Sequence, residues 1–141
     1  MDAHSAMMNV MDRIPVNPWD WSVAMGYNQA ERVQGADRWL MCAGQTSVDA
    51  EGKPQHAGDM GAQVSLATDN LEAVLAGADM SLANVVRMNF YTTDVDAFFE
   101  HSGVLAERMG AAGVKPPGTL LGVARLAFPE LMIEIEATAA D

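Results

Sequence analysis

The chain has 141 residues, half of them hydrophobic, which fits one domain, because two domains of half this length would each bury too little surface. Its formal net charge of -11 at pH 7 makes nucleic acids poor partners, since proteins hold phosphate backbones mainly through basic side chains. The apolar runs fall short of the roughly 20 residues of a membrane span, and no basic segment precedes an apolar one at the N-terminus, so we expect a cytoplasmic protein that binds no membrane.

The first 26 residues form an N-terminal extension with no helical or strand period, and residues 27–141 form the domain. Residues 1–12 are expected to be a mobile tail. Trp19 and Trp21 need an apolar surface, so we expect them to dock on the domain or on a neighbouring subunit.

Two short extended stretches follow, at 28–33 and 38–43, and the turn-forming residues 35–37 between them predict a β-hairpin. Cys42 lies in an apolar run of the second stretch, so a buried strand residue is a better interpretation than a nucleophile. A single cysteine cannot form an internal disulfide, which agrees with a reducing cytoplasm. A loop over 49–54 follows from its Gly and Pro content.

Two amphipathic helices are predicted, at 59–77 and from about 95 to 110, with a strand over 84–92 between them. Thr93 and Asp94 supply start signals for the second helix. Its predicted core stripe consists of Val95, Phe98, Ser102, Leu105 and Met109.

The prolines in 114–118 predict a loop, because they lack backbone donors and disfavour helix before them. The last two strands are predicted at 119–126 and 132–139, with a turn near 127–130. The order ββαβαββ indicates an α/β (α+β) domain in which one mixed sheet carries two helices on one face.

The open face of that sheet is not polar enough for a monomer. In the last strand Ile133 and Ile135 face the helices, which leaves Glu134 and Glu136 on the other side beside apolar groups. The strand at 85–91 has apolar residues on both faces. A second subunit is the simplest cover, so we expect an obligate oligomer.

Five motifs stand in the order and near the spacing of the Rid family (YjgF/YER057c/UK114, also described as endoribonuclease L-PSP), which the chain resembles from Tyr27 onward. The motifs are Ala43-Gly44-Gln45, Val85-Val86 with Thr93-Asp94 and Phe98, Pro116 to Thr119, Val123 to Leu126, and Ile133 to Ala137. The resemblance implies a chorismate-mutase-like fold and a homotrimer with an inner barrel and three small-molecule clefts between subunits.

In active relatives, the resemblance implies hydrolysis of reactive imines and enamines to ammonia and a keto acid, without a cofactor. An arginine holds the substrate carboxylate and a glutamate orients the attacking water. The glutamate corresponds to Glu134, which we predict to be catalytic. The cleft-lining tyrosine corresponds to Tyr27, the serine of Ser-Gly-Gln to Ala43, and the asparagine of the second helix to Ser102.

The arginine of the family's Pro-x-Arg-Ser/Thr motif corresponds to Gly118, which is the largest departure from the family pattern. Losing a bidentate carboxylate contact lowers the affinity for an anionic substrate about a hundredfold. Backbone N–H groups at Gly44 and Leu120 and the hydroxyl of Thr119 are still expected in the cleft. An arginine restored at position 118 is expected to raise activity only if the rest of the cleft is intact.

An alternative source of the missing positive charge is Arg32, Arg38 or Arg87 of another subunit. Arg125 occupies a different motif position and is better interpreted as structural. For Glu134, the alternative to a cleft position is a strand carboxylate that faces solvent. No metal site is expected, because the three histidines lack ligand spacing.

Two classes of function remain. The first is a cofactor-free, hydrolase or deaminase-like enzyme that acts on an imine, enamine or related carbonyl compound without a free carboxylate, and not on the usual amino-acid-derived 2-imino acids. The second is a non-catalytic trimer that binds a metabolite or a partner enzyme.

Overall fold

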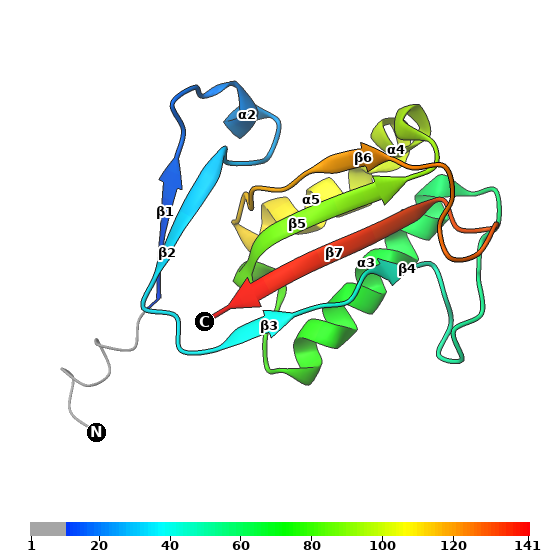
Figure 1. Cartoon of the computed structure of the whole chain (residues 1–141), viewed down its shortest axis with the longest axis horizontal. Helices are drawn as coiled ribbons and strands as arrows, with labels where there is room; N and C mark the ends of the chain where they lie inside the picture. The colour runs from blue at the N-terminus through cyan, green and yellow to red at the C-terminus, as the bar shows by residue number, and fades with distance from the viewer. Residues whose placement is uncertain (1–10) are drawn as a thin grey trace.

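A computed structural model describes residues 11–141, so His4 and nearly all of the expected mobile tail lie outside the described residues. The main body is a mixed sheet with helices behind one face (Figure 1). In the sheet the strands are ordered β3-β7-β5-β6, β4 also pairs with β7, and only β5 and β6 run parallel. Their bounds are β3 Trp39–Met41, β4 Gln45–Thr46, β5 Val85–Thr92, β6 Leu120–Gly122 and β7 Ile133–Ala140.

The predicted first helix is confirmed as α3 (Met60–Gly77), which the Asp59 side chain caps by accepting the amide of Ala62. The predicted second helix is wrong in one respect, because it is split into α4 (Val95–His101) and α5 (Gly103–Ala112). Ser102 and Gly103 have low helix propensity, so the chain bends there at little cost. A short 3-10 helix, η1 (Leu82–Asn84), leads into β5.

The two faces of β7 are divided as its alternation predicts. Ile133, Ile135 and Ala137 are buried in the core beneath the helices, whereas Glu134 and Glu136 lie on the opposite, open face. Pairing with β5 keeps the faces separate, since Phe90 stands opposite Ile135 on the helix side. Cys42, directly after β3, is a buried free cysteine, as expected.

The predicted hairpin is wrong. The chain instead forms a separate antiparallel sheet from β1 (Asp12–Val16) and β2 (Ala30–Gln34), and β3 pairs with the C-terminal strand β7. Local turn residues predicted a neighbouring partner, but long-range pairing with β7 closes the main sheet. The short helix α2 (Trp21–Ala24) lies between β1 and β2, and Figure 1 shows this unit beside the main body. Here it is called the N-terminal flap (residues 12–34).

One arginine fastens the N-terminal flap to the body. Nε of Arg13 donates to the carboxylate of Glu31 at 2.8 Å, and its guanidinium also donates to the carbonyls of Ala83 and Val85 at 2.8 and 2.6 Å. These contacts join β1 and β2 to the start of β5. Trp19 and Trp21 nevertheless remain 61% and 55% exposed, so their docking on a neighbouring subunit stays a prediction.

No helix in residues 11–141 is both long and apolar enough to cross a membrane.

Candidate functional site

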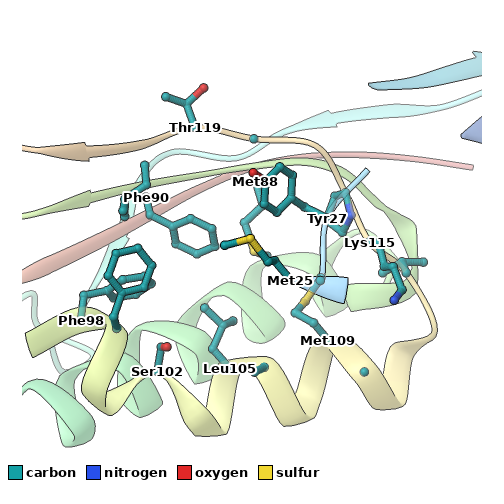
Figure 2. A pocket seen from close by; sticks show the side chains of 18 of the residues that line it. Met25, Tyr27, Met88, Phe90, Phe98, Ser102, Leu105, Met109, Lys115 and Thr119 are labelled. Carbon is teal, nitrogen blue, oxygen red and sulfur yellow. The ribbon is translucent and has the colours of Figure 1, made fainter. Parts of the chain in front are cut away.

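A cavity of about 720 Å³ lies between α5, the helix side of β5, and the loops that precede β2 and β6. Its wall is mostly apolar. Met88 and Phe90 come from β5, Phe98 and Leu105 from the helices, and Met25 from the N-terminal flap, as Figure 2 shows. A volume in this range accommodates a small organic molecule.

Five of the residues predicted to line the cleft line this cavity: Tyr27, Ser102, Gly118, Thr119 and Leu120. Trp21 and Tyr27 form a T-shaped aromatic pair, with 6.1 Å between ring centroids, which helps to position Tyr27. Ser102 lies at the junction of α4 and α5. The amide of Thr119 donates to Oδ1 of Asn89 at 3.0 Å. In Figure 2 the Thr119 side chain points away from the cavity, so its backbone rather than its hydroxyl forms the wall.

Gly118 has no room for a side chain. A Cβ placed on it would lie 2.7 Å from the carbonyl carbon of Met88 and closer still to the carbonyl oxygen. The φ angle of Gly118 is not among the positive ones, so the requirement for glycine here comes from the close approach of the loop before β6 to strand β5. The expectation that a restored arginine raises activity in an intact cleft therefore has a further condition, because β5 and the loop before β6 must move apart to admit a side chain at position 118.

The predicted catalytic residue, Glu134, lies on the open face of the sheet. Its carboxylate covers Gly44: a Cβ built on Gly44 would lie 2.6 Å from Cδ of Glu134. Thr46 of β4 and Tyr91 of β5 are its neighbours across the two strand pairs. Burial raises the pKa of the Glu134 carboxyl, and the negative charge of Glu136 raises it further. Ala43, beside Gly44, is exposed.

The second carboxylate on this face, Glu136, has the opposite environment. Asn89 donates to its Oε1 at 3.0 Å and the Tyr91 hydroxyl at 2.9 Å. These hydrogen bonds lower the pKa of Glu136, and donation to the carboxylate raises the pKa of Tyr91. Environments that push two carboxyl pKa values apart leave one group suited to proton transfer and keep the other ionised.

The predicted site residues thus fall into two groups on opposite faces of one sheet. The cavity group lies on the helix side and the Glu134 group, with Ala43 and Gly44, on the open side, with β5 and β7 between them. Within one protomer they do not meet.

Sequence reasoning missed several cavity residues. Lys115 and Met25 line the cavity, but neither belongs to one of the five motifs. The only available signal for Lys115 was its place three residues before Gly118. Among residues 11–141, no three side chains of His, Cys, Asp and Glu gather closely enough to hold a metal ion.

The sequence model of the family described as Endoribonuclease L-PSP matches residues 20–141. A RutC family protein of Pyrococcus horikoshii is 33% identical over 113 residues, which cover 80% of this chain and 85% of the relative. The mitochondrial protein mmf2 of Schizosaccharomyces pombe is 31% identical over 132 residues, covering 93% of this chain and 100% of the relative.

Solved structures agree. A Rid family protein of unknown function from Yersinia pestis, YyfB, has a TM-score of 0.78 and 33% identity, covering 92% of this chain and 98% of its own. A Mycobacterium tuberculosis member of the YjgF/YER057c/UK114 family has a TM-score of 0.63 and 28% identity, covering 94% and 100%. The fold, the matched motifs and these likenesses together show that the chain belongs to the Rid (YjgF/YER057c/UK114) family.

Proposed function

We propose that the protein hydrolyses a small imine, enamine or related carbonyl compound other than the usual 2-imino acids, in a site built from two protomers of a trimer. The observation that carries this proposal is the division of the site. The cavity of one protomer holds the substrate, and the Glu134 group of its neighbour supplies the acid-base chemistry.

The open face is suited to meeting a neighbour. Trp39, Met41 and Leu121 lie on the same face as Glu134 and are 52%, 69% and 49% exposed. Large exposed apolar groups of this kind commonly mark an interface between subunits. Covering them would also remove Glu134 from water, which would raise its pKa further and favour proton transfer near neutral pH.

The proposed reaction is the hydrolysis of a C=N bond. A water molecule adds to the C=N carbon while Glu134 takes its proton, and the same carboxyl then protonates the nitrogen. The hydroxyl proton of the resulting amino alcohol then passes through Glu134 to the amine nitrogen, the C–N bond breaks, and a C=O group and ammonia are released. Gly118 offers no charge to a carboxylate next to the reacting carbon, which supports a substrate other than a 2-imino acid.

The turnover test compares ammonia release from a neutral N–H ketimine, benzophenone imine, with release from 2-iminopropionate generated by an amino-acid oxidase. Wild type is expected to favour the ketimine. Glu134→Gln is expected to lower the rate by about 10²- to 10⁴-fold, whereas Glu51→Gln, in an exposed loop, is expected to leave it unchanged. Equal rates in wild type and Glu134→Gln would exclude the proposed chemistry.

A mixing experiment tests the two-protomer site. Ala106→Trp places a large side chain in the cavity from the exposed surface of α5, and each inactive variant keeps the half-site that the other lacks. Denaturing and refolding Glu134→Gln with Ala106→Trp should restore part of the activity, in particles near three times 15.1 kDa. No recovery in mixed trimers would show that the two halves do not act together across a subunit interface, which would contradict the proposal.

The second candidate is a non-catalytic trimer that binds a metabolite. The packing at Gly118 favours it, because a Cβ at this position would overlap the Met88 carbonyl, so position 118 supplies no charged side chain. Tight binding of carbonyl compounds without turnover of any imine or enamine would support this candidate.

A further inference from the structure

The charge inside the cavity differs from the charge of the whole chain. The sequence has 19 Asp and Glu residues against 8 Lys and Arg residues. Among the described residues that line the cavity, however, none is acidic, and one is basic, Lys115. The cavity of this acidic protein is therefore lined by one cation and by no carboxylate among the described residues. This distribution of charge favours an anionic group on the ligand.

The ammonium group of Lys115 is held by one hydrogen bond and has N–H donors left for a ligand. Its Nζ donates to the carbonyl of Val23 at 3.1 Å, a contact between the loop before β6 and the end of α2. An ammonium carries three N–H donors, so two remain for a ligand. Lys115 is exposed at the rim of the cavity, so a small anion can approach its ammonium group.

The rest of the cavity indicates what such a ligand carries besides its charge. In Figure 2, Lys115 lies at one end of the cavity and Phe98 at the other, with Met25, Met88 and Leu105 between them. The rings of Phe90 and Phe98 pack against each other at that far end, with centroids 5.4 Å apart. Flexible methionine side chains and aromatic rings bind apolar groups of varied shape.

We propose that Lys115 is the anion anchor of this site and that the ligand is a monoanionic amphiphile, with an aromatic or branched apolar body directed toward Phe98. The proposal rests on the proposed function, since it names the substrate class of the same cavity. Nζ of Lys115 contacts the Val23 carbonyl of α2, whereas Gly118 packs against the Met88 carbonyl of β5, so the charge at Lys115 stands apart from position 118. The anionic group is then separated from the reacting carbon by the apolar body, unlike the carboxylate of a 2-imino acid.

The experiment measures binding by calorimetry with two probes of equal shape, 5-phenylvalerate and its neutral amide, 5-phenylvaleramide. Wild type is expected to bind the acid about fivefold more tightly than the amide, as for an ion pair near a surface. Lys115→Met should bind both probes equally, and Lys115→Arg should keep the preference for the acid. Lys53→Met, the matched control in an exposed loop, should behave as wild type.

Two results would overturn the inference: equal binding of acid and amide by wild type, which requires no variant to fold, or an undiminished acid preference in a folded Lys115→Met. The outcomes are separable from those of the proposed function. An acid preference that depends on Lys115, without turnover of any imine, leaves this inference standing and removes the catalytic proposal. Turnover of the neutral ketimine with no preference for the acid probe leaves the catalytic proposal standing and removes this inference.

Discussion

Replacing Gly118 by alanine is expected to destabilise the protein although it adds one methyl group. The added Cβ lies 2.7 Å from the carbonyl carbon of Met88, whereas ordinary contact begins at 3.4 Å. Met88 belongs to β5, which lies between β6 and β7, so it has little freedom to move away. The loop before β6 must shift instead, which strains the bond from the Met88 amide to the Pro117 carbonyl at 3.1 Å.

Overpacking a rigid site lowers stability by about 1–3 kcal/mol, and a weakened hydrogen bond adds about 1 kcal/mol. We therefore expect Gly118→Ala to lower the free energy of unfolding by about 2–4 kcal/mol, and Gly118→Arg by at least as much. Gly110→Ala is the control, because nothing lies within 4 Å of its Cβ and alanine favours the helix. Urea unfolding at one fixed protomer concentration is the measurement. A Gly118→Ala midpoint equal to that of wild type would refute this account of the missing side chain.

Three further results are expected. Arg13→Met removes the hydrogen bonds that fasten the N-terminal flap, so the flap should become much more susceptible to limited proteolysis. The control Arg32→Met, on the exposed side of β2, should be cleaved as slowly as wild type. Equal cleavage of the two variants would contradict the fastening role of Arg13. Folding raises the pKa of Glu134 above its ordinary 4.5, so the folded protein loses stability as the pH rises above 4.5 and through the higher pKa of the folded state. Glu134→Gln should therefore melt at a higher temperature than wild type at pH 7, and the difference should vanish below pH 4.5. Glu136→Gln removes the charge that helps to raise the pKa of Glu134, so the acidic limb of the pH–rate profile should move to lower pH. An unmoved limb would show that Glu136 does not influence the titration of Glu134.

Much of the candidate site was predictable because its residues lie on elements with a clear period. The alternation of β7 placed Glu134 opposite the core residues, and the motif order placed Ser102 and Gly118 on the right segments. Their distribution over two faces of the sheet was not predictable, because the strand order decides it and β5 lies between β7 and β6 through long-range pairing. Lys115 was missed because a rim cation in a proline-rich loop has no periodic signal.

The failed parts of the fold prediction have physical reasons as well. The sequence of β1 contains Pro15 and only a weak alternation, which is tolerated in an edge strand but does not predict one. Because β1 was not predicted, the segment that forms β2 was predicted to pair with the next extended stretch, at 38–43. The division between α4 and α5 had a visible signal in Ser102 and Gly103, but an apolar stripe that continued to Met109 outweighed it.

The contact between Gly118 and the Met88 carbonyl also bears on how such a protein can evolve. Because a Cβ at position 118 would overlap the Met88 carbonyl, a substitution that introduces arginine there is expected to destabilise the chain before its charge can be used. A charged side chain at this position would require the two backbone segments to separate first, so substitutions at the rim of the cavity are a more accessible route to a new ligand preference. The packing at Gly118 thus restricts which substitutions can change what the cavity binds.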